Sequence, residues 1–279
     1  MIANTERNGR VAAPKSPDKP KDTKPHISIS QVRAYSLCSL QWQMSRQHKP
    51  EFVSSSLVFG SAFHSAVEAL HQARLEGGNL LPEELKTIFG SRFDGEELPI
   101  RFGKGEDRQS LIGTAGRMID AYCAQLTPSQ VIAIEEPFEL QLDASTPPVV
   151  GFIDMIELRK DADGVERAFL VDFKTAARKP SPEDMDTEQL TLYSLAADNL
   201  GLSRQLGLPV HLRYDVVTKA KTPEVISIPV NPTVADRIRV LEKAKTCWRG
   251  MAGNVCFPSP GWQCANCGYA KRCEAWPKE

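Results

Sequence analysis

The sequence predicts an α/β protein in which one mixed sheet is flanked by helices. The stretch from residue 27 to residue 126 carries apolar side chains at helical spacing, whereas several segments after residue 130 alternate with the period of a strand. Asp163–Gly164 separates two of these segments, and an Asp-Gly pair is a strong signal for a hairpin turn. Helices, a three-strand meander, a helix, two strands and a last helix follow in that order, which fits a single mixed sheet.

Composition narrows the class of protein. The chain has 279 residues, of which 41% are hydrophobic and 25% are charged, as in an ordinary globular protein. It has no apolar run of about 18 residues and no apolar N-terminal stretch, so we expect a cytoplasmic protein with no membrane partner. The formal net charge of −1 does not by itself indicate a nucleic-acid partner.

The N-terminal half is predicted to be helical after a disordered basic tail at residues 1–25, which are rich in Pro, Lys and Asp. One helix is expected over 27–46 with Ser28 or Ser30 as its cap, and the clearest helix begins near residue 57 and ends at Gly77–Gly78. A weaker helix covers about 82–92, and Asp107 caps a further one that extends through residue 126.

The C-terminal half predicts the sheet. The expected strands are 131–142, 149–160, 165–174, 209–218 and 224–230. A helix over about 184–200 takes Asp184 or Asp186 as its cap, and Asn231–Pro232 opens another helix that ends near residue 250.

Two opposite charges lie in the third strand of the meander. Asp172 and Lys174 are two residues apart and therefore point to the same face of the sheet. A buried charge needs a partner or a metal, and a salt bridge is the ordinary explanation for such a pair. If the Asp163–Gly164 turn is central, however, Asp154 lies opposite a position near Phe173. Two close carboxylates repel each other, and a hard divalent cation is the usual remedy.

Two helices carry further polar groups. His64 faces away from the apolar side of its helix, together with Glu68 and His71. Gln189 and Tyr193 are one turn apart on a later helix and share a face. Taken alone, each of these two groups of residues would be unremarkable.

In combination, these segments resemble a known family. The ordered set "GSAFHSAVE", "GFIDMIE", "VDFKT" and "QLTLYSLAA" spans residues 60–197 and resembles the PD-(D/E)XK nuclease superfamily. The RecB-like exonuclease branch is the most similar, a branch that includes nuclease domains of helicase–nucleases and CRISPR-associated adaptation nucleases. The resemblance implies a restriction-endonuclease-like fold.

The resemblance also implies roles for residues. Asp154 and Asp172 would bind Mg²⁺ or Mn²⁺, with His64 and the backbone carbonyl of Phe173 as further ligands, and Lys174 would orient the attacking water. Gln189 and Tyr193 would position the lysine or the DNA strand. Glu135 is a candidate for an additional carboxylate. Such a cation suits phosphodiester cleavage because it lowers the pKa of bound water and takes up developing charge. "GFIDMIE" lacks the basic residue that the family often has beside the aspartate, which leaves the strand contacts open.

The cysteines indicate a second metal centre. Cys264, Cys267 and Cys273 have the spacing C-x2-C-x5-C, which allows three thiolates to converge on one metal. The resemblance implies a fourth ligand from a helix before the core, which would be Cys38, and Cys256 is its rival. The spacing alone does not separate a [4Fe-4S] cluster from structural Zn²⁺; the resemblance implies the cluster, and Zn²⁺ is the alternative. Cys123 and Cys247 are expected to be buried thiols.

These observations predict a nuclease core at residues 26–257 and an iron–sulfur segment at 258–279 packed on the N-terminal helix. The expected activity is metal-dependent DNA hydrolysis, as an exonuclease on single strands or duplex ends, in DNA processing, repair or recombination. Two alternatives are a non-catalytic iron–sulfur or zinc DNA-binding accessory protein and a restriction-type endonuclease. The sequence has no P-loop, so a partner helicase, recombinase or CRISPR integrase would supply any motor or joining activity.

Overall fold

The computed structural model describes residues 25–276 apart from 162, 182 and 184, and the predicted tail at 1–25 lies outside this part except for its last residue. The sheet has six strands. They are β1 (Ile27–Ser28), β4 (Gln130–Leu140), β5 (Val149–Lys160), β6 (Glu166–Ala176), β7 (Val210–Thr218) and β8 (Val225–Val230). β4, β5 and β6 form an antiparallel meander, β7 is parallel to β6, and β8 is antiparallel to β7, so the predicted mixed sheet is confirmed.

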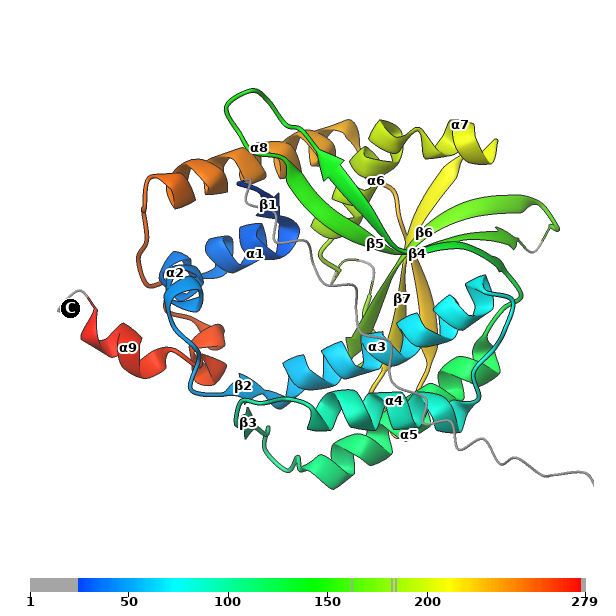
Figure 1. The fold of residues 1–279 in the computed structure, drawn as a ribbon, viewed down its shortest axis with the longest axis horizontal. Coiled ribbons are helices and arrows are strands. Elements are labelled where there is room, and N and C mark those ends of the chain that lie inside the picture. The colour runs from blue at the N-terminus through cyan, green and yellow to red at the C-terminus, as the bar shows by residue number, and fades with distance from the viewer. Residues whose placement is uncertain (1–24, 162, 182, 184, 277–279) are drawn as a thin grey trace, which may run out of the picture.

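Helices cover both faces of this sheet (Figure 1). Their bounds are α1 (Ile29–Leu37), α2 (Ser39–Gln47), α3 (Ser55–Leu75), α4 (Pro82–Asp94), α5 (Arg108–Gln125), α6 (Glu188–Leu200), α7 (Leu202–Leu206), α8 (Val234–Ala252) and α9 (Ala270–Ala275). Two short strands, β2 (Val53–Ser54) and β3 (Ile100–Arg101), pair with each other beside α3. Among the described residues, no helix combines the length and the apolar content that a membrane span requires.

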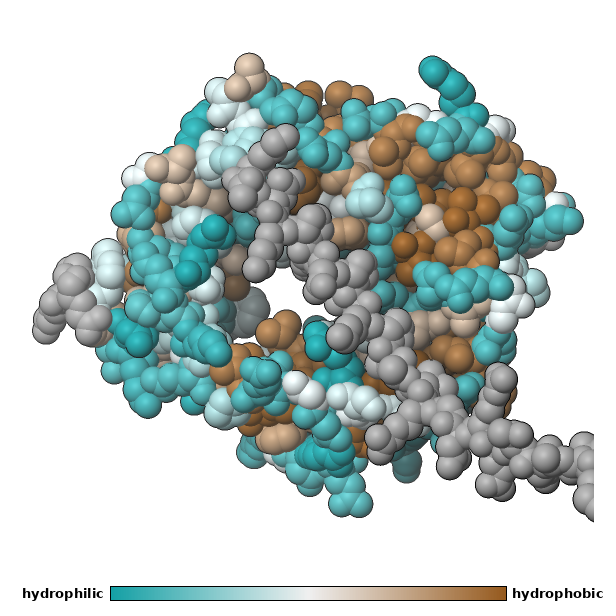
Figure 2. Space-filling view, in the orientation of Figure 1, coloured by the Kyte–Doolittle hydropathy of each residue, from teal (hydrophilic) through white to brown (hydrophobic). Residues whose placement is uncertain are grey.

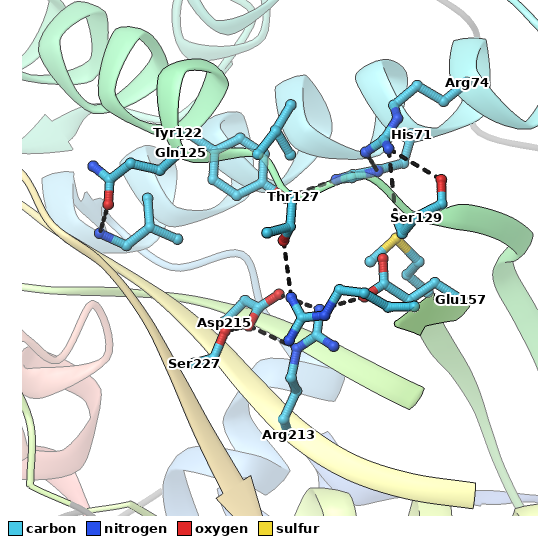
Figure 3. Close-up of a pocket in the computed structure, with 14 residues that line it drawn as sticks. His71, Arg74, Tyr122, Gln125, Thr127, Ser129, Glu157, Arg213, Asp215 and Ser227 are labelled. Atoms are coloured by element: carbon cyan, nitrogen blue, oxygen red, sulfur yellow. Dashed lines mark hydrogen bonds and ion pairs between the residues drawn. The ribbon is translucent and has the colours of Figure 1, made fainter. Parts of the chain in front are cut away.

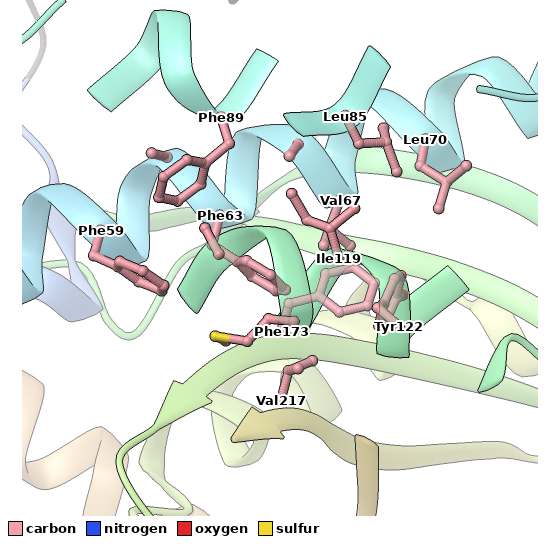
Figure 4. Packing of buried hydrophobic residues seen from close by; sticks show 14 of the residues in the cluster. Phe59, Phe63, Val67, Leu70, Leu85, Phe89, Ile119, Tyr122, Phe173 and Val217 are labelled. Carbon is pink, nitrogen blue, oxygen red and sulfur yellow. The ribbon is translucent and has the colours of Figure 1, made fainter. Parts of the chain in front are cut away.

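The long helix α3 is covered on both sides. Its apolar side packs against α4 and α5, as Figure 4 shows for Phe59, Phe63 and Phe89, and the cluster continues to Phe173 and Val217 in the sheet. A second apolar cluster joins α6 to the other face of the sheet. His64 lies on the flank of α3 next to the sheet, where its Nε2 is 2.8 Å from Asp154 of β5, and its side chain stays partly exposed.

Three helix starts differ from the sequence prediction. The single helix expected over 27–46 is two helices, because Cys38 is extended (φ −161°, ψ 105°) and ends α1 where α2 begins. α8 begins at Val234, two residues later than the start at Pro232 that the sequence predicted, because Thr233 and Asp236 form a reciprocal capping box. α6 begins at Glu188, and its cap is Thr187, not Asp186 as one of the predictions had it. Asp186 nevertheless accepts a hydrogen bond from the Glu188 N–H. The other predicted cap, Asp184, lies outside the described residues.

The two ends of the described chain meet. The carbonyl of Phe257 accepts hydrogen bonds from the Leu40 N–H (3.2 Å) and the Ser39 hydroxyl (3.1 Å), and Glu51 N–H donates to the carbonyl of Gly268 (2.9 Å). These contacts hold the C-terminal segment against α2, as Figure 1 shows for α9. Figure 2 shows an opening through the molecule, which comparison with Figure 1 places between α1 and the start of α3.

Candidate active site

The site forms where β5 and β6 separate. Met155 pairs with Val171 as the last pair of their antiparallel ladder, and the next positions along the two strands are Asp154 and Asp172. Beyond this point the N–H of Phe173 donates to Asp154 Oδ2 at 3.0 Å, so a side chain replaces the partner strand. Both aspartates are buried, and Asp172 has no exposed surface. The register differs by one residue from the hairpin expected from the sequence, which brings the two carboxylates into closer opposition.

Asp154 is the most connected residue of the site. His64 Nε2 lies 2.8 Å from Asp154 Oδ2, and the Tyr193 hydroxyl donates to Asp154 Oδ1 at 3.1 Å. The same hydroxyl lies 3.4 Å from Asp172 Oδ1 and so bridges the two carboxylates. Lys174 pairs with Asp172 Oδ2. The residues predicted from the sequence therefore lie together, on α3, β5, β6 and α6.

The electrostatics of the pair are unequal. Burial, followed by the negative charge of Asp154, raises the pKa of Asp172 to about 6. Burial also opposes ionisation of Asp154, but the hydrogen bond and charge of His64, aided by Lys174 and the Phe173 N–H, lower its pKa overall. Burial disfavours the charged form of His64, yet contact with Asp154 outweighs it and raises the pKa of His64 to about 9. Without a cation, an imidazolium thus balances one carboxylate and Lys174 the other.

Gln189 holds the lysine in place. Its Oε1 accepts hydrogen bonds from Lys174 Nζ (3.2 Å) and from Arg33 Nη1 (3.0 Å), while its Nε2 donates to the Tyr193 hydroxyl (3.1 Å). Arg33 also pairs with Asp186 at 2.9 Å. Arg33 was missed by the sequence reasoning, because it lies on α1, 156 residues from Gln189, and no local pattern marks it.

A third carboxylate adjoins this group. Glu135 lies in β4 between Ile134, which pairs with Met155, and Glu136, which pairs with Ile153, and this places it beside Asp154. Its φ of +49° is a left-handed conformation, which is unusual for a non-glycine residue and concentrates at functional sites. One ligand atom each from His64, Glu68 and Glu135 lie within 4.8 Å of one another. Burial raises the pKa of Glu68, and the nearby His64 opposes that shift.

His71, which shares the predicted polar side of α3, serves packing. It is buried, its Nε2 lies 2.7 Å from the Tyr122 hydroxyl, and its ring stacks on Phe173 with 5.4 Å between centroids. Burial, and then the charge of Arg74, lower the pKa of His71 to about 3, so the ring is neutral. His71 thus supports Phe173 from the side opposite to the carboxylates.

The cysteines form a separate group. Cys38, Cys264, Cys267 and Cys273 line one cavity of about 200 Å³ together with apolar residues such as Met44 and Tyr269. Burial raises the pKa of both Cys267 and Cys273, and the neighbouring thiols add to this shift. Cys256 does not line the cavity, and its sulfur lies 2.9 Å from Gln43 Oε1. Cys247 is buried and Cys123 is half-buried, both within helices.

Comparison with known proteins identifies the family of the chain. The model of the family described as "PD-(D/E)XK nuclease superfamily" matches residues 26–274. A solved structure from Eubacterium rectale, described as a "putative exonuclease", has 12% identity and a TM-score of 0.48 over 90% of this chain and 88% of its own. The solved structure of SSO0001 has 11% identity and a TM-score of 0.33 over 88% of this chain and 95% of its own. No curated protein matches the chain.

The protonation of His64 leads to a prediction for cation binding. An imidazole that binds a metal must be neutral, so a divalent cation that binds His64 must displace a proton from a group whose pKa is about 9. The pKa of Asp172 is about 6, so below that pH a cation that binds Asp172 must displace a second proton. Affinity for Mn²⁺ should therefore rise as pH rises from 6 toward 9. Calorimetry in buffers of different ionisation enthalpy should show proton release near neutral pH that is much smaller in His64→Asn. Equal heats in all buffers at pH 7 would show that His64 is not a ligand.

Proposed function

Because the chain belongs to the PD-(D/E)XK nuclease superfamily, we propose that it is a metal-dependent DNA nuclease of the RecB-like branch that works from strand ends. The observation that carries the proposal is the convergence of Asp154, Asp172 and Lys174 where β5 and β6 separate. A degenerate, non-catalytic member of the fold has no need to keep two buried carboxylates in mutual repulsion. The geometry therefore favours an enzyme over an accessory DNA-binding protein.

The donor set fits a hard divalent cation. Asp154 and Asp172 would supply carboxylate oxygens, the backbone of Phe173 would supply a carbonyl oxygen, and His64 would supply a nitrogen that shifts the preference from Mg²⁺ toward Mn²⁺. When bound, the cation would lower the pKa of a ligand water and take up charge that develops on the phosphate. Glu68 and Glu135 each place a carboxylate oxygen within 4.8 Å of a ring nitrogen of His64.

The chain's own residues would orient the reactants. Lys174, held between Asp172 and Gln189, presents an ammonium group that donates to a water or to a phosphate oxygen. Gln189 is fixed from behind by Arg33, so the lysine has a defined position before substrate arrives. The Tyr193 hydroxyl donates to Asp154 Oδ1 at 3.1 Å and lies 3.4 Å from Asp172 Oδ1, so it bridges the two carboxylates. Gln189 and Tyr193 are thus positioning residues in this proposal.

The preference for strand ends is supported by the shape of the molecule. The site takes residues from α1, α3, β5, β6 and α6, and the opening in Figure 2 lies between α1 and α3. The contacts of Phe257 and Gly268 with the N-terminal segment close the chain around this opening. A single DNA strand that reaches the carboxylates through a closed opening must enter by a free end, which favours an exonuclease over a restriction-type endonuclease.

The four cysteines would hold a structural [4Fe-4S] cluster. Cys38 comes from the break between α1 and α2 and the other three come from the C-terminal segment, so a shared centre would fasten the two ends of the chain. In a tetrahedral zinc site the four thiolates would all lie about 2.3 Å from one metal ion. In a [4Fe-4S] cluster each thiolate would bind a different corner of the cluster.

The proposal extends to organisation and context. Residues 26–257 would form the nuclease core and 258–279 the cluster segment, in a cytoplasmic protein engaged in DNA processing, repair or recombination. A helicase, a recombinase or a CRISPR integrase would be a suitable partner. Co-purification from the native host tests this part.

The division of roles at the site predicts different losses. Asp172→Asn should reduce Mn²⁺-dependent cleavage of labelled DNA at least roughly 1,000-fold and should weaken Mn²⁺ binding, because a charged ligand is lost. Lys174→Met should reduce cleavage about 100-fold or more while Mn²⁺ affinity stays close to that of the wild type. The control Lys179→Met removes an exposed lysine that pairs with Glu224 and should have no effect on either quantity. Wild-type cleavage by Asp172→Asn would exclude this site as the catalytic centre.

Entry through an opening predicts dependence on free ends. Linear single-stranded DNA should be degraded, whereas a circular strand of the same sequence should resist. A linear strand blocked by a bulky protein at both ends should also resist, because neither end can pass. Equal cleavage of circular and linear strands would indicate an endonuclease.

An iron–sulfur cluster bound by the four cysteines would colour the protein, and loss of any one ligand would remove the colour. Anaerobically purified protein should be brown, and substitution by Ser of Cys38, Cys264, Cys267 or Cys273 should bleach it, because each thiolate holds one corner of the cluster. Cys123→Ser is the matched control and should stay brown. Colourless protein with one equivalent of zinc would show that the centre is a Zn²⁺ site and not a cluster. Bleaching by Cys256→Ser but not by Cys38→Ser would show that Cys256 is the fourth ligand.

A further inference from the structure

A polar cavity lies away from the catalytic residues. It has a volume of about 220 Å³ and lies among the C-terminal ends of α3 and α5, the loop that follows α5, and strands β5, β7 and β8 (Figure 3). None of the predicted catalytic or metal-binding residues lines it. Its walls carry three arginines, Arg74, Arg159 and Arg213, which is a high concentration of positive charge for so small a space.

Arg213 is the most informative of these residues because it is buried. Only 5% of its side chain is exposed. Its Nε and Nη2 donate to Asp215 at 2.9 Å each, and Nη2 also donates to Glu157 at 2.6 Å. Its Nη1 is buried and has no hydrogen-bond partner within the described part of the chain. A buried guanidinium nitrogen without an acceptor is unfavourable, and an acceptor from a ligand would satisfy it.

The other two arginines present donors to the same cavity. Arg74 Nη2 donates to the carbonyl and the hydroxyl of Ser129 at 3.3 and 3.4 Å, and Arg159 Nη1 donates to the Thr127 hydroxyl at 3.0 Å. Figure 3 shows Arg74 and Ser129 at the opposite side of the cavity from Asp215 and Arg213. Each bond uses one nitrogen of a group that has five N–H donors, so the two guanidinium groups have donors to spare.

The charge balance favours an anion. Three arginines face two carboxylates, Glu157 and Asp215, and both carboxylates are already bound to Arg213. His71 also lines the cavity and adds no charge, because burial and Arg74 lower its pKa to about 3. The lining therefore has a formal charge of +1 before a ligand enters.

From this arrangement we propose that the cavity binds a small phosphate-bearing anion through Arg213 Nη1, Arg74 and Arg159. Guanidinium groups recognise phosphate oxygens by directed, charge-assisted hydrogen bonds. The volume of about 220 Å³ is below the range of about 300–1,000 Å³ typical of sites for larger ligands, so a polynucleotide does not fit. The ligand is either free phosphate or the phosphate of a mononucleotide. This inference does not depend on the proposed nuclease activity.

The cavity has a defined relation to the catalytic site. His71 lines the cavity and stacks on the ring of Phe173, whose N–H donates to Asp154. Phe173 points to the face of β6 opposite to Asp172 and Lys174, because side chains alternate along a strand. An anion in the cavity is therefore separated from the catalytic carboxylates by the sheet and would not compete with a DNA phosphate.

Titration calorimetry with inorganic phosphate, at constant ionic strength and without added divalent cation, tests the proposal. Wild-type protein should bind about one equivalent, and Arg74→Gln and Arg159→Gln should each weaken binding at least roughly ten-fold, as expected for a lost charge-assisted hydrogen bond. Arg117→Gln, an exposed change on α5 outside the cavity, and Lys174→Met in the catalytic site should both bind as the wild type does.

Two further measurements identify the source of the phosphate and distinguish a loss of binding from a loss of folding. Tighter binding of deoxyadenosine 5′-monophosphate than of phosphate would assign the site to a nucleotide, and equal or weaker binding would assign it to free phosphate. Arg213→Lys retains a charge for Glu157 and Asp215, and should lose phosphate binding while its far-ultraviolet circular dichroism stays unchanged. Absence of phosphate binding, equal loss in Arg117→Gln, or loss in Lys174→Met but not in Arg74→Gln would overturn the inference.

Discussion

The repulsion between Asp154 and Asp172 is the constraint on which the rest of the site depends. Both carboxylates are buried, and burial, followed by the negative charge of Asp154, raises the pKa of Asp172 to about 6. The side chains around the pair compensate for this repulsion. His64 balances Asp154, Lys174 balances Asp172, and the Tyr193 hydroxyl lies between the two carboxylates. Two buried negative charges at this distance are unfavourable without a counter-ion, and a divalent cation between them is favourable. Such a site is therefore suited to metal-dependent phosphodiester cleavage.

The surrounding fold serves to hold these charges in place. β5 and β6 separate so that the Phe173 N–H meets a carboxylate and not a strand, and α3 is enclosed by two layers so that His64 reaches Asp154. His71 and Tyr122 support Phe173 from the other face. Arg33 extends the network to α1, and so connects the site to the N-terminal segment against which the cysteine-rich end of the chain packs.

Much of this could be predicted from sequence because local rules apply to it. Alternation and the Asp163–Gly164 turn predicted β5 over the residues that it occupies, and the two-residue spacing of Asp172 and Lys174 fixed their common face. The features that escaped prediction depend on contacts distant in sequence. Arg33 reaches Gln189 only through the packing of α1, and the break at Cys38 has no glycine or proline to announce it. The start of α8 was misplaced because the capping box of Thr233 and Asp236 outweighed the Asn-Pro signal.

Thermal unfolding with and without Mn²⁺ tests the central claim most directly. At pH 8 a raised pKa means that ionised Asp172 opposes folding, so Asp172→Asn should unfold at a higher temperature than the wild type when no cation is present. Addition of Mn²⁺ should raise the unfolding temperature of the wild type and leave that of Asp172→Asn nearly unchanged, because a cation stabilises only the state that binds it. If Asp172→Asn unfolds at a lower temperature without cation and still gains stability from Mn²⁺, the carboxylate pair is a structural feature and the cation binds elsewhere.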